Sequence, residues 1–192
     1  GNALEVKEAI ATLNGNGPED LRELVLVLTS LMVVKAGKAK DIREARILLE
    51  ETLDSGKALQ VMKEWIVAQG GTAEEVEHPD LLPQALCQEA VCAEKSGFVT
   101  KIHTEEIGRI CMLLGGGRAK KGDPIDLSVG LVLRKKVGDP VHSGESLAIL
   151  HANDREKLAE AKERLLKAYE IKKEPVAVRP LIWKILDGTE AE

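Results

Sequence analysis

The residue types that most often carry out chemistry are few in this sequence, and their spacing forms no complete catalytic site. Four histidines occur, and they do not have the i, i+4 spacing of a helical metal site. No acidic residue or serine can be identified from the sequence as a catalytic partner of any of them. They are His78, His103, His142 and His151. We therefore interpret each histidine as structural and assign no catalytic residue to this chain.

The three cysteines point away from redox and zinc chemistry. Their number is odd and no CxxC spacing occurs, so neither a disulfide framework nor a zinc site is indicated. Cys92 and Cys111 lie in apolar patterns, and we expect both to be small buried side chains rather than nucleophiles. This cysteine usage favours a reducing, cytoplasmic compartment.

A glycine-rich segment, Gly115-Gly116-Gly117-Arg118, is the clearest candidate for a functional loop. It is no P-loop, because it lacks the GxxxxGK[ST] spacing and follows a helical pattern instead of opening one. Two interpretations stay open. The glycines end a helix with close backbone packing, or the basic residues that follow form a flexible loop that closes over an anionic ligand or a neighbouring lobe. The candidate closure residues are Gly116, Gly117 and Arg118.

The stretch from Val137 to Leu150, VGDPVHSGESLAIL, resembles half of a biotinyl or lipoyl carrier domain. Such carriers present a lysine at a tight turn, which in the biotinyl domains lies between two methionines. Here all three methionines lie in helical patterns, and the residues after the stretch open a helix. Because the attachment lysine is absent, we expect neither carrier function nor an organic cofactor.

Length and composition indicate one large or two small globular domains. The 192 residues are 44% hydrophobic and 31% charged, and 27 basic against 32 acidic residues give a formal net charge of -5. These charges are spread along the chain, so the sequence shows no basic cluster of the kind that binds nucleic acid or an anionic membrane. The longest apolar run, Leu24 to Leu28, is far shorter than the roughly 20 residues that span a bilayer. We expect a soluble, intracellular protein whose partners are small molecules or proteins.

The first part of the chain is predicted to be helical. Residues 1–71 contain helical patterns closed by glycine at 2–13, 18–35, 41–56 and 59–70, and we expect the second helix to be largely buried. Asp41 and Glu44 form an N-cap pair for the third helix. Residues 72–84 are acidic and broken by prolines, which is typical of a surface linker.

The second part mixes strands with helices. Within residues 85–170, strand patterns cover 86–94, 98–103, 125–133 and 146–151, and helical patterns cover 104–114 and 153–169, the latter capped by Asn153. Residues 171–192 form a last strand, at 176–179, and a tail. Since strands and helices do not alternate regularly, the predicted fold class is α+β.

Three segments resemble the pyrimidine-nucleoside phosphorylases, the family that includes thymidine phosphorylase. They are GNALEVKEAI at 1–10, GPEDLRELVL at 17–26, and LLGGGRAKKGDPIDLSVGLVLRKKVGDPVHSGESLAIL at 113–150. The resemblance runs in order along essentially the whole chain and is closer to the broad-specificity bacterial branch than to the thymidine-specific one. It implies that residues 1–71 are helices of the family's central α/β domain and that 85–170 form its α/β-hammerhead-like C-terminal domain.

The resemblance also implies the chemistry of a parent enzyme. Members are two-lobe, cytoplasmic homodimers that use phosphate to split pyrimidine nucleosides into the free base and a pentose 1-phosphate. The family's KHSTGG-type phosphate-binding segment and its base-contacting residues do not occur here, and the chain opens without methionine. We therefore expect the C-terminal fragment of such an enzyme, inactive by itself.

One family role falls on a residue that is present. In the bacterial members, backbone carbonyls and a glutamate at the position of Glu8 hold a structural potassium ion. An oxygen-only site with one carboxylate suits a hard cation, so Glu8 is the metal ligand that the resemblance implies. The carbonyls would come from upstream sequence, and we expect the site in this chain to be empty or Glu8 to be salt-bridged. From spacing alone, Glu5 and Glu8 mark a solvated helix face.

Two alternatives remain open. The chain derives from a thymidine-specific or nucleotide phosphorylase of the same superfamily, or it is a stand-alone, non-catalytic binding module. The sequence upstream of Gly1 would discriminate between them.

In the family, the glycine-rich segment faces the other lobe across the active-site cleft, which makes the closure loop as well supported as the helix stop.

Overall fold

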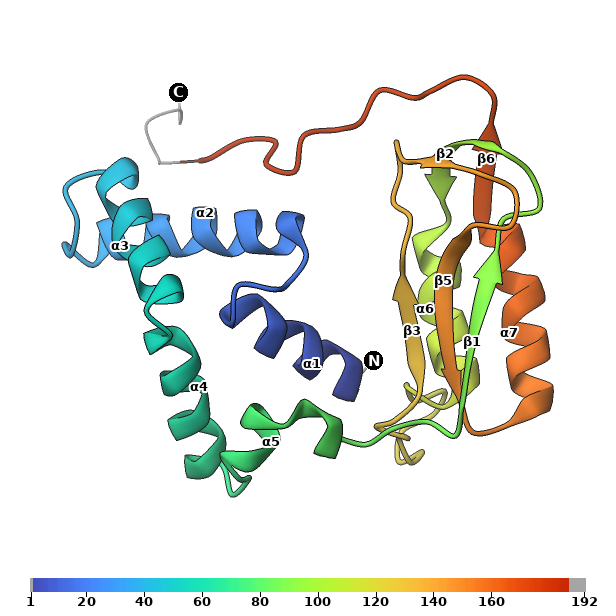
Figure 1. Ribbon diagram of the computed structural model, residues 1–192, viewed down its shortest axis with the longest axis horizontal. Helices are drawn as coiled ribbons and strands as arrows, with labels where there is room; N and C mark the ends of the chain where they lie inside the picture. Colours follow the sequence, from blue (N-terminus) through green and yellow to red (C-terminus); the bar gives the residue numbers. More distant parts are fainter. Residues whose placement is uncertain (1, 187–192) are drawn as a thin grey trace. The chain divides into compact units, whose positions relative to one another are not determined.

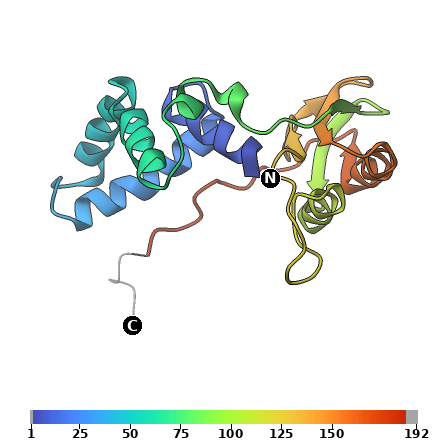
Figure 2. The same ribbon diagram turned by 90° about the horizontal axis from the view of Figure 1, so that it is seen from below.

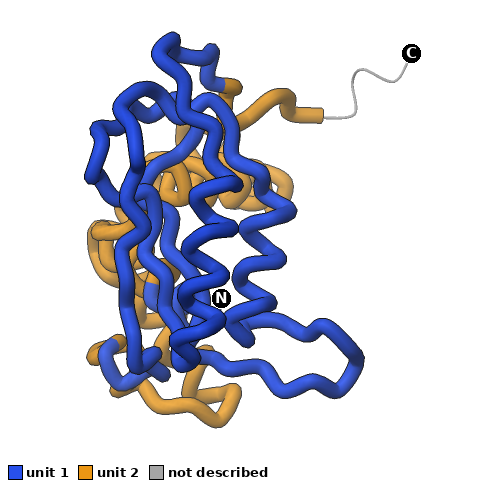
Figure 3. The backbone as a smooth tube through the Cα atoms, turned by 90° about the vertical axis from the view of Figure 1, so that its right-hand side faces the viewer, with its two compact units in different colours: residues 1–7, 80–178 blue, residues 8–79, 179–192 orange. Residues whose placement is uncertain are grey.

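The computed structural model describes residues 2–186, and the chain divides into two compact units. Unit 1 comprises Gly1–Lys7 and Asp80–Val178, and unit 2 comprises Glu8–Pro79 and Arg179–Glu192 (Figure 3). Helices combine with two small antiparallel sheets, which confirms the predicted α+β class. The change of unit at residue 80 lies inside the segment 72–84 that the sequence predicts as a linker.

Unit 2 is helical. Its helices are the end of α1 (Asn2–Leu13), then α2 (Glu19–Lys35), α3 (Ile42–Asp54), α4 (Lys57–Ala68) and the short α5 (Glu74–Glu77), followed by a 3-10 turn at Pro79–Leu81 (Figure 1). The four long helices lie where the sequence predicts them. The short helix and the turn were not predicted, because they lie within the acidic, proline-containing segment.

The helix ends follow from local side-chain chemistry. Asp41 Oδ1 accepts a hydrogen bond from the Glu44 amide over 2.8 Å, and Glu44 Oε2 accepts one from the Lys40 amide over 2.8 Å. This arrangement confirms the predicted N-cap pair of α3. Gly15, at φ +79°, follows the end of α1 in the left-handed conformation that favours glycine.

One prediction about unit 2 is wrong: α2 is not largely buried. Only Leu26 and Ser30 are buried in it, whereas Leu28 is 51% exposed and Met32 is 69% exposed. The reason is geometric, because α3 packs closely on α2 and covers only one of its faces.

Unit 1 holds both sheets, and every strand pair is antiparallel. One sheet has the order β1-β5-β3, made of β1 (Cys87–Cys92), β5 (Ser146–Ala152) and β3 (Gly130–Leu133). The other has the order β4-β2-β6, made of β4 (Pro140–Val141), β2 (Gly97–Ile102) and β6 (Tyr169–Lys172). A short turn joins β1 to β2, yet the two strands enter different sheets (Figure 1).

Helices α6 (Thr104–Leu114) and α7 (Arg155–Ala168) lie side by side in unit 1 (Figure 2). The predicted inner face of α7 is confirmed, because Leu158, Ala161, Leu165 and Ala168 are buried. Both helices close one core with the sheets, whose most buried members include Val91, Val99, Ile110, Val129, Leu147, Leu150 and Leu165. The strands and helices packed around this core set the positions at which the loops of unit 1 begin and end.

The end of unit 1 corrects two predictions. The last strand is β6, directly after α7, and not 176–179, because Ile171 pairs with Val99 and is buried whereas Val178 is 64% exposed and pairs with no strand. The N-cap of α7 is Asp154 and not Asn153, since Asp154 Oδ1 accepts from the amides of Glu156 and Lys157 over 2.9 and 3.1 Å. In addition, the strand expected over 125–133 is confined to 130–133.

The carrier-like stretch forms β4 and β5 with two glycine turns. Gly138 lies at φ +98° and Gly144 at φ +84°, a conformation that L side chains rarely adopt. A Cβ at Gly138 would also lie 2.2 Å from Val178 Cγ2. Both glycines therefore serve the turns of the β unit.

Candidate functional site

Helix α6 ends in the glycine-rich segment. Gly115, at φ +106°, donates its amide to the Met112 carbonyl over 3.0 Å, and the Gly116 amide donates to the Cys111 carbonyl over 2.9 Å. This paired bonding around a left-handed glycine is a common way to end a helix. The helix-stop interpretation is therefore confirmed, while the closure role stays a prediction.

The next two glycines differ in what surrounds them. A Cβ at Gly116 would lie 2.8 Å from Cys111 Sγ and 3.2 Å from the Cys111 carbonyl oxygen. A Cβ at Gly117 would meet Met112 atoms at 3.5 Å or more, which is ordinary contact. Gly116 is thus required by close packing, whereas Gly117 has room for a side chain.

Residues 117–125 form a loop that projects from the helices and sheets of unit 1 (Figure 2). Its basic side chains, Arg118, Lys120 and Lys121, are exposed. Arg118 Nε donates to the Asp123 carbonyl over 3.2 Å, and the Lys120 amide donates to Asp123 Oδ2 over 2.8 Å. The tip therefore has its own hydrogen bonds and presents positive charge to solvent.

The base of this loop is closed by backbone hydrogen bonds. The Asp126 amide donates to the Gly115 carbonyl over 2.9 Å, so that the two ends of the loop meet. The first turn of α1, which belongs to unit 1, also contacts both ends: Asn2 Nδ2 donates to the Gly116 carbonyl over 3.2 Å and the Ala3 amide to the Leu127 carbonyl over 3.1 Å.

A side-chain cluster completes the base. Asp126 Oδ1 accepts from the amide and the hydroxyl of Ser128 over 2.9 and 2.6 Å, and Asn153 Nδ2 donates to Asp126 Oδ2 over 2.7 Å and to Ser128 Oγ over 2.9 Å. The Ser128 hydroxyl, with smaller contributions from its amide and from Asn153, lowers the pKa of Asp126 against the opposing effect of burial. Asp126 is therefore held as a carboxylate.

Sequence reasoning missed Asn2, Asp126, Ser128 and Asn153 as parts of one site. Asp126 and Ser128 are two residues apart, and an aspartate that bonds the chain two residues on is a known turn signal, so this pair was detectable. The contacts of Asn2 and Asn153 span 114 and 27 residues, and no local pattern encodes them.

Glu8 lies in α1 with an exposed side chain, and its carbonyl accepts from Thr12 Oγ1 over 2.7 Å. Within residues 2–186 there is no group of three or more His, Cys, Asp or Glu side chains that could hold a metal ion. Among the described residues, Glu8 therefore belongs to no such cluster of side chains.

Two of the histidines contact a glutamate, one through its ring and one through its backbone amide. His103 Nε2 lies 3.0 Å from Glu170 Oε1, and the His142 amide donates to Glu145 Oε2 over 2.9 Å. All three cysteines are free thiols, but Cys92 is exposed, so the expectation that it is buried is wrong. It lies at the end of β1, whose side chains alternate between two faces, and it shares the exposed face with Gln88 and Ala90 opposite the buried Val91.

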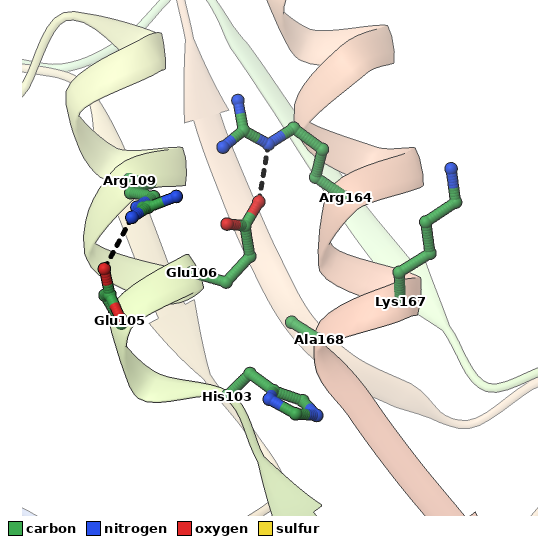
Figure 4. A pocket seen from close by; sticks show the side chains of 7 residues that line it. All are labelled: His103, Glu105, Glu106, Arg109, Arg164, Lys167 and Ala168. Atoms are coloured by element: carbon green, nitrogen blue, oxygen red, sulfur yellow. Dashed lines mark hydrogen bonds and ion pairs between the residues drawn. The ribbon is translucent and has the colours of Figure 1, made fainter.

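A groove of about 380 Å³ lies between α6 and α7, and both of its arginines are paired with carboxylates (Figure 4). Arg164 Nε contacts Glu106 Oε1 over 2.6 Å, and Arg109 Nη2 contacts Glu105 Oε1 over 2.6 Å. Both arginines are thus occupied by carboxylates, and the groove presents no cationic cluster for an anion.

No helix in the described part of the chain is long and apolar enough to cross a membrane.

Comparison with known proteins identifies relatives for most of the chain. Residues 98–172 match the family described as the pyrimidine nucleoside phosphorylase C-terminal domain. The pyrimidine-nucleoside phosphorylase of Bacillus subtilis (strain 168) is 57% identical over 153 residues, covering 80% of this chain and 35% of that protein. That of Geobacillus stearothermophilus is 49% identical over 183 residues, covering 95% of this chain and 42% of that protein. That of Staphylococcus aureus (strain bovine RF122 / ET3-1) is 54% identical over 153 residues, with 80% and 35% coverage. The chain thus spans about two fifths of the length of these relatives and matches their C-terminal part.

Proposed function

The chain belongs to the pyrimidine-nucleoside phosphorylase family, whose C-terminal part it matches, and we propose that it serves as the C-terminal part of such an enzyme. The single observation that carries this proposal is 49% identity to a pyrimidine-nucleoside phosphorylase over 95% of the chain. In the proposed reaction a phosphate oxygen bonds to the anomeric carbon of a uridine- or thymidine-type nucleoside. The bond to the pyrimidine breaks, and the base leaves with the electron pair and takes up a proton.

In this proposal the chain helps to position phosphate and nucleoside, and none of its residues takes part in making or breaking bonds. Phosphorolysis depends on holding phosphate and nucleoside in line and on stabilising charge on the departing base. The chain spans about two fifths of its relatives, so we assign the phosphate- and base-binding residues to the rest of the parent enzyme and expect the chain alone to be inactive. Nucleoside and phosphate are then partners of the parent.

We assign the closure role to Gly116, Gly117 and Arg118. Support comes from the projecting loop, whose base is closed by hydrogen bonds and whose tip presents Arg118 to solvent. Such a loop acts by ordering a site and excluding water rather than by bond chemistry. Arg118→Ala in the parent enzyme should raise KM or lower kcat, and unchanged values would leave only the helix-stop role.

We also propose Glu8 as one oxygen ligand of a structural potassium ion in the parent enzyme. Its exposed carboxylate is compatible with that role, and the remaining ligands would come from outside the described residues. The ion would supply a fixed positive charge that holds neighbouring backbone oxygens in place. Glu8→Gln should weaken the dependence of thermal stability on potassium, with sodium as the control cation.

The assembly proposed for the parent is a cytoplasmic homodimer, on the strength of the resemblance alone. Light scattering on the complete enzyme would test the oligomeric state.

The deciding experiment is an assay of the complete open reading frame that contains this sequence, beside the 192-residue chain. Release of uracil from uridine and of thymine from thymidine should require phosphate and should occur only with the complete enzyme. A complete enzyme that cleaves no pyrimidine nucleoside would overturn the proposal, and turnover by the chain alone would overturn the assignment of its inactivity.

A further inference from the structure

Asn153 lies at a junction of three segments of unit 1. Its Oδ1 accepts from the Leu86 amide over 2.7 Å, just before β1, while its Nδ2 donates to Asp126 and Ser128 at the base of the loop. Both amide hydrogens and the amide oxygen are therefore used. Because Asp154 is the N-cap of α7, the side chain of Asn153 is free to make these contacts.

The loop tip has no comparable attachment. Among residues 2–186, the hydrogen bonds made by residues 117–125 stay within the loop, such as those from Arg118 and Lys120 to Asp123. Within the described structure, hydrogen bonds therefore tie this loop to the rest of unit 1 only at its two ends. One of those ends runs through Asp126 and Ser128, which Asn153 holds.

We infer that Asn153 is a positioning residue, which sets the direction in which the loop presents Arg118. The inference rests on the proposed closure role of the loop. Asn153 joins the loop base to β1 and to the start of α7, two elements anchored in the core of unit 1. An amide suits this junction because it donates twice and accepts once, which neither a carboxylate nor an apolar side chain can do.

The negative charge of Asp126 makes the junction specific for an amide at position 153. Asp126 is held as a carboxylate, and its Oδ2 lies 2.7 Å from Asn153 Nδ2. Asn153→Asp keeps the shape and the acceptor for the Leu86 amide, but it removes both donors and sets a second carboxylate against the first. Like charges at this distance repel, so the loop base should open.

Exchanging the carboxylate at position 126 with the amide at position 153 should close the loop base again. In the double variant Asp126→Asn with Asn153→Asp, the amide donates from the opposite side to the carboxylate. Position 126 keeps an oxygen for the amide and hydroxyl of Ser128, and position 153 keeps one for Leu86. The exchange therefore restores the hydrogen bond between positions 126 and 153 and removes the repulsion, which separates this bond from the general effects of either substitution.

Hydrogen exchange of the 192-residue chain tests the inference directly. Asn153→Asp should speed amide exchange in residues 115–128 by roughly tenfold, with β2 and β6 unchanged, and the double variant should recover most of the protection. Asn16→Asp is the matched control, because its side chain is exposed and makes only a 3.4 Å contact with the Asn14 carbonyl. Unchanged exchange in Asn153→Asp, or no recovery in the double variant, would overturn the inference.

Kinetics of the parent enzyme separate the inference from the proposed function. Asn153→Asp should change the same parameter, KM or kcat, as Arg118→Ala, by roughly tenfold, and the double variant should restore it. If Arg118→Ala has no kinetic effect, the proposed closure role fails, whatever the exchange data show. If Arg118→Ala impairs turnover and Asn153→Asp does not, the closure role stands and the positioning role of Asn153 fails.

Discussion

Gly116 packs against Cys111 so closely that a Cβ on the glycine would lie 2.8 Å from the cysteine sulfur. The contact joins the start of the loop to the last turn of α6. It also distinguishes Gly116 from Gly117, which the sequence alone presents as equivalent.

Gly116→Ala should therefore destabilise unit 1, and Gly117→Ala should not. An added methyl group has to displace Cys111 or the loop backbone, which costs about 1–3 kcal/mol of the free energy of unfolding, whereas the change at Gly117 should stay within about 0.5 kcal/mol. Urea denaturation followed by circular dichroism measures both. Equal stabilities of the two variants would contradict the steric argument.

Tyr169 should ionise only in strong alkali. Burial raises its pKa to about 12, with a smaller contribution from Asp139, and its hydroxyl donates to the Lys135 carbonyl over 3.0 Å. The folded pKa lies above the unfolded value, so the stabilisation is complete below about pH 10 and is lost as pH rises toward 12. Tyr169 is the only tyrosine, so phenolate absorbance reports on it alone. Ionisation near pH 10 in the folded chain would contradict the burial.

Tyr169→Phe should lower the free energy of unfolding by about 1 kcal/mol, because it removes one buried hydroxyl that donates to a carbonyl. Thermal unfolding at neutral pH measures the change. Loss of the alkaline transition in the same variant serves as the control for the titration.

His151 should stay neutral in mildly acidic solution. Burial, followed by the positive charges of Lys7 and Arg134, lowers its pKa. The unfolded chain then takes up a proton first as pH falls below about 6.5, so this residue makes stability decline on acidification. NMR titration of the imidazole Cε1 proton should give a lower midpoint for His151 in the folded chain than in the urea-unfolded chain. A folded midpoint at or above the unfolded one would refute the effect.

Arg46 should link α2 to α3 through its paired contact with Glu23. Its Nη1 and Nη2 donate to the two carboxylate oxygens over 2.9 and 2.7 Å, and its Nε donates to Glu50 over 2.9 Å. Arg46→Ala should cost about 0.5–1 kcal/mol, since the pair is partly exposed, and high salt should reduce the loss. Arg43→Ala, an exposed arginine on the same helix, is the matched control and should have a smaller effect.

The elements that local chemistry controls could be predicted from the sequence. The four long helices of unit 2, the Asp41 and Glu44 cap and the stop at Gly115 lie where the sequence predicts them. The family was also identifiable, because its motifs run in order along the chain. Of the candidate site, the position of the loop was predictable, whereas its anchoring contacts were not.

The wrong predictions concern residues that could interact either with a neighbour in the sequence or with a residue far along the chain. Asn153 is a good N-cap by type, but Asp154 takes that role and leaves the Asn153 amide for Asp126 and Leu86. Residues 176–179 have a strand-like pattern, but β2 already pairs with β6.

The sequence by itself determined the ends of the long helices of unit 2 to within a few residues, the stop of α6, the glycine turns and the family, since caps and turns depend on residues only a few positions apart. Only the tertiary structure decided which sheet receives β1 and β2, and that Asn2 and Asn153 meet the base of one loop. The physical reason is that strand pairing and side-chain junctions bring together residues far apart in the chain. Which of the possible partners meet is set by burial of the common core, and no spacing in the sequence records it.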